Sequence, residues 1–62
     1  MTIMSTQVIA EIEYLLAQLL EGPVTFDGSE PLARKDAFKS LLERDVVKYR
    51  VMDSGEYEVR LW

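Results

Sequence analysis

Hydrophobic residues between positions 6 and 21 recur with the period of an amphipathic helix. At a helical rotation of about 100° per residue, the large aliphatic side chains fall within one arc of about 140°, the width of a stripe that faces a core. These residues are Val8, Ile9, Ile12, Leu15, Leu16, Leu19 and Leu20. The opposite arc is polar. The pattern therefore predicts a helix from Thr6 to Glu21.

Both ends of this helix have suitable terminal residues. Ser5 can act as the N-cap, because its hydroxyl can accept an early free backbone N–H. Met4 and Ile9 have the spacing of a hydrophobic staple. Gly22 is expected to adopt the left-handed conformation after the last turn, and Pro23 cannot continue the helix.

The middle of the chain predicts a short strand and a second helix. Val24 to Phe26 is a β-prone run, and the turn dipeptide Asp27-Gly28 closes it. Pro31 suits the first helical position and keeps Glu30 outside the helix, which is expected to run to about Arg44. One side of this helix is apolar and carries Ala37, Phe38, Leu41 and Leu42.

The last segment alternates apolar and polar residues in two runs, which is typical of a β-hairpin. A three-residue loop from Asp53 to Gly55, with Gly55 left-handed, brings the apolar residues of both runs to one face. A two-residue loop would instead oppose Val51 and Glu58. Because a one-residue slip inverts the buried face, we predict the longer loop, which also sets Arg50 opposite Glu58. The apolar set is Val47, Tyr49, Val51, Tyr57, Val59 and Leu61.

The order of helix, short strand, helix and hairpin predicts an α+β fold in two layers, with the helices on one face of an antiparallel sheet of two or three strands. We expect residues 1–62 to form a single small domain. A domain of this size has a marginal core, and without Cys no disulfide or thiolate metal site can supplement it. We therefore expect a homodimer, with the first helix or an open hairpin edge near Tyr57 to Trp62 in the contact.

Composition argues against catalysis, so we expect no enzyme, catalytic residue, cofactor or metal. The chain has no His, and its serines occur at caps, turns and one helix face. Asp27 to Glu30 reads as a turn before a helix, because it lacks the ligand pattern of a calcium loop. We expect no targeting segment and no membrane span, and a cytoplasmic location.

Charge divides the chain into an acidic half and a mixed half. The net charge is -4, yet residues 1–31 hold five acids and no base, while residues 32–62 hold all seven bases and six acids. This polarity is suited to orienting a contact with a partner. The candidate interaction residues are bases of the hairpin and two aromatics at polar positions, types that often anchor interfaces: Tyr14, Lys48, Arg50, Arg60 and Trp62.

The element order resembles that of a winged-helix domain. Leu41 to Val47 run into a hairpin turned at Asp53-Ser54-Gly55, and a short strand follows the first helix. In that family a recognition helix leads into a β-hairpin wing, and two helices separate the short strand from the wing. This chain has one helix there, so it resembles a truncated winged-helix domain, and the resemblance implies DNA binding.

Three functions remain open. The leading hypothesis is a non-enzymatic module with a regulatory or accessory role, which binds a protein partner and also a second copy of itself. The first alternative is a minimal winged-helix-like DNA binder, although affinity for DNA comes largely from phosphate neutralisation and the chain is acidic. The second is an acidic decoy that occupies a nucleic-acid-binding protein.

Overall fold

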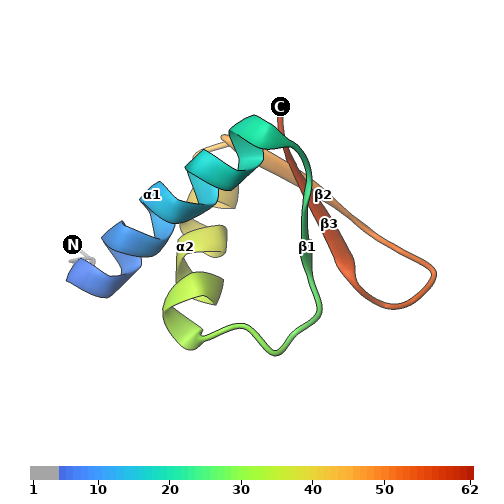
Figure 1. The fold of residues 1–62 in the computed structure, drawn as a ribbon, viewed down its shortest axis with the longest axis horizontal. Coiled ribbons are helices and arrows are strands. Elements are labelled where there is room, and N and C mark those ends of the chain that lie inside the picture. Colours follow the sequence, from blue (N-terminus) through green and yellow to red (C-terminus); the bar gives the residue numbers. More distant parts are fainter. Residues whose placement is uncertain (1–4) are drawn as a thin grey trace.

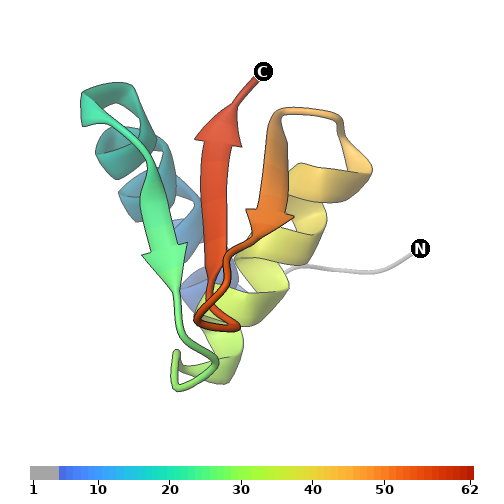
Figure 2. The ribbon, with the colours of Figure 1, turned by 90° about the vertical axis from the view of Figure 1, so that its right-hand side faces the viewer.

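The structure is a computed structural model that describes residues 5–62, and its elements occur in the predicted order (Figure 1). Two helices and three strands follow one another: α1 (Thr6–Glu21), β1 (Val24–Phe26), α2 (Leu32–Glu43), β2 (Val47–Val51) and β3 (Tyr57–Leu61). The helices lie together behind one face of the sheet (Figure 2). The α+β prediction is thus confirmed, and the bounds of α1 are those predicted.

The sheet is antiparallel and has the order β1-β3-β2, so the last strand of the chain is the central one. Val59 of β3 pairs with Tyr49 on one side and with Val24 on the other. The expectation of an open hairpin edge near Tyr57 to Trp62 is therefore wrong for most of that edge, because β1 pairs with β3 from Tyr57 to Val59. The open edges belong to β1 and β2.

The hairpin has the predicted register and turn. Val51 lies opposite Tyr57 and Arg50 opposite Glu58. Before the turn, the Met52 N–H donates to the Glu56 carbonyl at 2.8 Å, and the Gly55 N–H donates to the Met52 carbonyl at 2.9 Å. Gly55 has φ +89°, in the left-handed region that glycine tolerates best. The three-residue loop is confirmed.

The ends of α1 agree with the prediction in part. The Ser5 hydroxyl accepts a hydrogen bond from the Val8 N–H at 3.2 Å, so Ser5 is the N-cap. Gly22 follows the helix with φ 158° and ψ -174°, a positive φ that L side chains rarely adopt but one that lies outside the left-handed helical region. The predicted conformation is wrong because the chain passes directly into the extended β1 rather than turning back on the helix. The Met4–Ile9 staple lies outside the described residues.

Helix α2 begins one residue later than predicted. Pro31 is extended, with φ -56° and ψ 151°, and its carbonyl accepts hydrogen bonds from the N–H groups of Arg34 and Lys35 at 3.0 and 3.1 Å. Pro31 therefore precedes the first turn as its cap residue, and Leu32 is the first helical residue. The apolar side of α2 is as predicted, with Ala37 and Leu41 buried.

The C-terminal end of α2 depends on Asp45, which has φ 58°. The N–H of Val46 donates to the Leu41 carbonyl at 3.0 Å, and the N–H of Asp45 donates to the Leu42 carbonyl at 3.1 Å. This pair of hydrogen bonds reverses the chain direction at the end of a helix, and it requires a left-handed conformation at the first residue after the cap, which here is Asp45. Aspartate is one of the few types other than glycine that adopts this conformation readily. The chain can then enter β2 directly.

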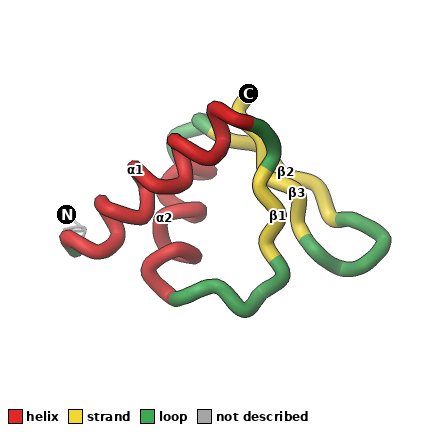
Figure 3. The backbone as a smooth tube through the Cα atoms, in the orientation of Figure 1, coloured by secondary structure: helices red, strands yellow, loops and turns green. Residues whose placement is uncertain are grey.

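The core lies between the helices and the inner face of the sheet, which carries Val47, Tyr49 and Val51 on β2 and Tyr57, Val59 and Leu61 on β3. The fully buried residues come from every element: Leu15, Leu19, Phe26, Ala37, Leu41, Val47 and Val59. The hairpin extends beyond the helices (Figure 3), so Val51 and Tyr57 at its far end stay exposed on the inner face. Neither helix in residues 5–62 is long and apolar enough to cross a membrane.

Candidate functional site

The outer face of the sheet is turned away from both helices and faces the viewer in Figure 2. Strand alternation places the polar residues of all three strands on this face, opposite the core residues. Its members are Thr25, Lys48, Arg50, Glu58, Arg60 and Trp62. Within β2 and β3 themselves, three bases against one acid give this face a local excess of positive charge, which Glu56 beside the turn reduces by one.

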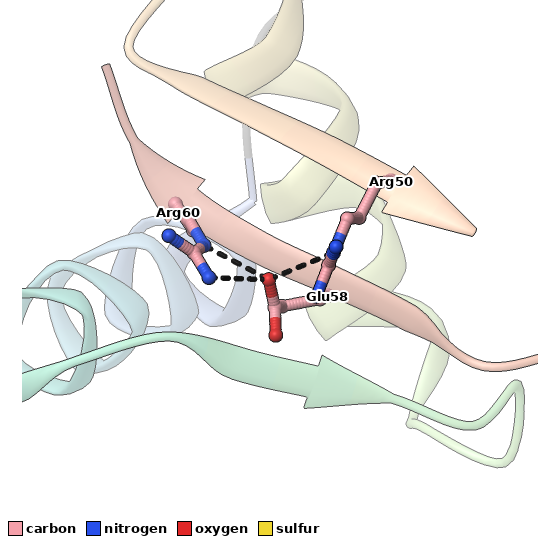
Figure 4. A network of polar contacts seen from close by, with 3 residues as sticks. All are labelled: Arg50, Glu58 and Arg60. Carbon is pink, nitrogen blue, oxygen red and sulfur yellow. Dashed lines mark hydrogen bonds and ion pairs between the residues drawn. The ribbon is translucent and has the colours of Figure 1, made fainter. Parts of the chain in front are cut away.

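Glu58 holds two arginines at the centre of the outer face (Figure 4). Its Oε1 accepts from Arg50 Nε at 3.1 Å and from Arg60 Nε at 2.8 Å. The hydrogen bond from Arg60 and the weaker contribution of Arg50 hold the pKa of Glu58 below its ordinary value, against the opposing effect of desolvation. Glu58 is only 16% exposed, whereas the side chains of Arg50 and Arg60 are 69% and 52% exposed. The carboxylate is thus covered, and the guanidinium groups face solvent.

Trp62 extends the outer face beyond the end of β3. The backbone N–H of Trp62 donates to the Val46 carbonyl at 3.3 Å, so the pairing of the hairpin strands continues one residue past Leu61. Lys48 Nζ lies 5.2 Å from the centroid of the Trp62 ring, within the range of a cation–π contact. The indole is nevertheless 75% exposed. It adds a large apolar surface beside the bases.

A small open hollow lies between these side chains. It has a volume of about 240 Å³ and is lined by Lys48, Tyr49, Arg50, Glu58 and Arg60. Pockets that enclose small-molecule ligands are usually about 300 to 1,000 Å³, so this hollow is suited to a single side chain or acidic group. With cationic donors around it, the chemistry that it favours is the binding of an anion such as a carboxylate.

Tyr14 lies apart from the other candidate residues, in the helical layer. The guanidinium carbon of Arg34 is 5.0 Å from the centroid of the Tyr14 ring. Arg34 also donates from Nε to the Glu11 carboxylate at 2.9 Å, and this contact raises the pKa of the Arg34 guanidinium. Glu11 and Tyr14, one turn apart on α1, therefore hold a single residue of α2. The structure brings the four hairpin candidates together and gives Tyr14 a contact within the fold.

Two ion pairs of the structure were missed by the sequence reasoning. Arg60 and Glu58 are two residues apart on β3, a spacing that puts both on one face of a strand and that could have been noticed. The pair between Arg34 and Glu11 joins two helices across 23 positions of the sequence. No local spacing indicates this second pair, because it depends on how α1 and α2 pack.

The loop from Asp27 to Glu30 is the predicted turn. Glu30 accepts hydrogen bonds from the N–H groups of Asp27 and Gly28 at 2.9 and 3.0 Å. Asp27 accepts from the Ser29 hydroxyl at 2.6 Å and from the Ser29 N–H at 2.9 Å. These bonds from Ser29, first of all from its side chain, lower the pKa of Asp27 to about 2. Both carboxylates thus serve the turn itself.

Comparison with known proteins finds no family model, no curated protein and no solved structure that matches the chain. The resemblance to a winged-helix domain therefore rests on the order of the elements alone and stays a prediction.

Proposed function

We propose that the protein is a small non-enzymatic interaction module of the cytoplasm, which binds another protein in a regulatory or accessory role. The observation that carries this proposal is the outer face of the sheet, where the exposed guanidinium groups of Arg50 and Arg60 lie beside Lys48 and the exposed indole of Trp62. Arginine and tryptophan are the residue types that contribute most per residue to protein interfaces. An open face with one shallow hollow is suited to contact with the surface of a partner protein.

A protein partner is favoured over nucleic acid by the charge of the rest of the molecule. The five acids of residues 1–31 and the net charge of -4 repel the phosphate backbone. An acidic patch on another protein can be met locally by the outer face without bringing the remaining acids close. Winged-helix-like DNA binding remains the second candidate, because Lys48, Arg50 and Arg60 do gather on one face.

A second copy of the chain is a further candidate partner, through a different surface. Ile9 and Leu20 lie at one edge of the apolar stripe of α1, and they are 48% and 78% exposed. Leu16, between them on the same edge, is only partly buried. Joining two such edges would bury aliphatic surface that the single domain leaves in water. The outer face of the sheet would stay free in this dimer.

Capture from a nuclease-treated lysate of the native host tests the proposed function. The immobilised parent chain is compared with a variant of the outer face, Lys48→Ala with Trp62→Ala, and with a control, Lys35→Ala with Lys39→Ala, whose sites are exposed on α2. We expect a protein that the parent and the control retain and that the outer-face variant loses. The purified protein should then bind the parent in solution with the same dependence. Equal retention by all three chains would contradict the proposal.

Mobility shift on random duplex DNA at low salt tests the second candidate. We expect weak binding or none. Tight and steeply salt-dependent binding that is lost on Lys48→Glu with Arg50→Glu would contradict the protein-partner proposal and favour the DNA-binding one.

A further inference from the structure

The free edge of β2 presents hydrogen-bonding groups of the backbone to solvent. The backbone hydrogen bonds at the two ends of the hairpin, from Met52 to Glu56 and from Trp62 to Val46, fix which residue pairs are hydrogen-bonded. Hydrogen-bonded and non-bonded pairs alternate along an antiparallel ladder. The backbone N–H and C=O groups of Lys48 and Arg50 therefore bond to β3, whereas those of Tyr49 and Val51 point away from it. In the sheet order β1-β3-β2, no strand of residues 5–62 lies on the other side of β2 to pair with these groups. An extended chain can therefore pair with them.

The side chains along this edge differ sharply between the two faces of the sheet. Lys48 and Arg50 stand on the outer face, where Nε of Arg50 donates to Glu58 and Nζ of Lys48 lies over the Trp62 ring. Tyr49 and Val51 stand on the inner face, where they are 50% and 61% exposed because the hairpin extends past the helices. The edge is thus basic on one side and apolar on the other.

A row of aromatic rings makes the apolar side a continuous surface. The Tyr49 ring is 5.9 Å from the Phe38 ring and 5.7 Å from the Tyr57 ring, both in edge-to-face geometry. Phe38 in turn lies 5.1 Å from the buried Phe26. The exposed end of the inner face is therefore anchored in the core, and it can receive apolar side chains without rearranging.

The charges of β2 disfavour pairing with a second copy of the same strand. Both outer-face residues of the exposed stretch are bases, so any β2–β2 pairing sets Lys48 and Arg50 against the same bases of the other copy. Like charges placed opposite one another destabilise a strand pair, and basic residues at an edge are a common protection against self-association. The same bases favour a strand of opposite charge.

We propose that β2 is a docking edge for an extended acidic segment of a partner protein, which adds to the sheet as a fourth strand. The segment carries Asp or Glu at alternate positions, facing Lys48 and Arg50, and apolar residues between them, facing Tyr49 and Val51. Backbone hydrogen bonds to the outward groups supply affinity, and the alternating side chains supply specificity. This inference rests on the proposed function and names the kind of partner and the surface it uses.

The first test uses amide hydrogen exchange and a synthetic peptide. In the free chain we expect the amides of Tyr49 and Val51 to exchange rapidly and those of Lys48 and Arg50 slowly. A capped peptide in which Glu alternates with Val should slow exchange at Tyr49 and Val51 on binding. A peptide of the same composition in blocks rather than in alternation is the control for charge alone. Lack of binding at millimolar concentrations of the alternating peptide would overturn the inference.

Backbone methylation of the peptide separates strand pairing from electrostatic attraction. Methyl groups on the alternate amides that face β2 remove the donors, and we expect at least about tenfold weaker binding. Methyl groups on the intervening amides should have little effect. Equal loss with both methylation patterns, or with neither, would contradict pairing at this edge.

Variants of the chain test the same contact from the other side. Val51→Pro removes an outward N–H that β3 does not use, and Val51→Ala keeps it, so only the proline variant should lose peptide binding. Lys48→Glu with Arg50→Glu should reverse the preference, to a peptide in which Lys alternates with Val. A natural partner that binds the outer face but leaves the exchange of Tyr49 and Val51 unchanged would refute the docking edge and leave the proposed function standing. If no protein partner is found but the peptide still binds at β2, the docking edge stands and the proposed function is refuted.

Discussion

Gly55 closes the hairpin with a left-handed backbone, and its role is conformational rather than steric. A Cβ added at this position would meet no atom within 4 Å, so a side chain there has space but an unfavourable φ of +89°. We expect Gly55→Val to lower the free energy of unfolding by about 2 kcal/mol, because a β-branched residue is strained in this region. Chemical denaturation measures the change.

Gly55→Asn is the matched control, since asparagine adopts the left-handed region more readily than valine. It should lose clearly less stability than Gly55→Val. If the valine variant unfolded at the same denaturant concentration as the parent, the three-residue turn would not be the one present in solution.

Asp27 gives the turn before α2 a dependence on pH. The pKa of its carboxyl group is about 2 in the folded chain, below the ordinary value of 3.8. A carboxyl group with a lowered folded pKa contributes stability above its unfolded pKa, and that contribution is lost as the pH falls through the folded pKa. We therefore expect the contribution of Asp27 to be present above about pH 4 and to disappear towards about pH 2.

The comparison of the parent with Asp27→Asn isolates this effect from the other acids. Between about pH 5 and pH 2, the parent should lose more unfolding free energy than the variant, whose side chain does not titrate. Thermal unfolding at several pH values gives the difference. Parallel pH profiles for the two chains would show that Asp27 has the same pKa folded and unfolded.

At the scale of the elements, the inner face of the hairpin is buried at one end and exposed to solvent at the other. Val59 and Val51 occupy the same inner face, yet Val59 is 2% exposed and Val51 is 61% exposed. Val59→Ala should cost about 2 kcal/mol of unfolding free energy, because it leaves a cavity among core residues. Val51→Ala should change it by less than about 0.5 kcal/mol. Equal losses at both positions would mean that the distal hairpin is covered in solution.

At the scale of the whole molecule, the small core predicts self-association. The chain has a mass of 7.2 kDa, and α1 leaves Ile9 and Leu20 exposed at the edge of its stripe. Oligomerisation commonly stabilises domains of this size that have no disulfide. We expect sedimentation equilibrium at micromolar concentration to give the mass of a dimer, and Ile9→Glu with Leu20→Glu to give that of a monomer. A single-chain mass for the parent at all concentrations, with cooperative unfolding, would contradict the dimer.

The elements and most of the local geometry of this protein could be predicted from the amino-acid sequence, the conformation of Gly22 and the start of α2 at Leu32 being the exceptions. The 3.6-residue stripe of α1, the cap at Ser5 and the three-residue turn at Gly55 follow from interactions between near neighbours, which a sequence pattern records directly. The register of the hairpin also follows, because only one alignment puts the apolar residues on one face. Four of the five candidate interaction residues share an outer face for the same reason.

The tertiary structure decided what covers each surface, and this depends on contacts between distant parts of the chain. The pairing of β1 with β3 closes most of the edge near Tyr57 and leaves that of β2 open. The packing of α1 on α2 gives Tyr14 a contact with Arg34. The short helices cover Val59 but not Val51. Alternation assigns a residue to a face, but only the placement of the opposite layer determines whether that face is buried, because burial depends on the lengths and positions of the elements together.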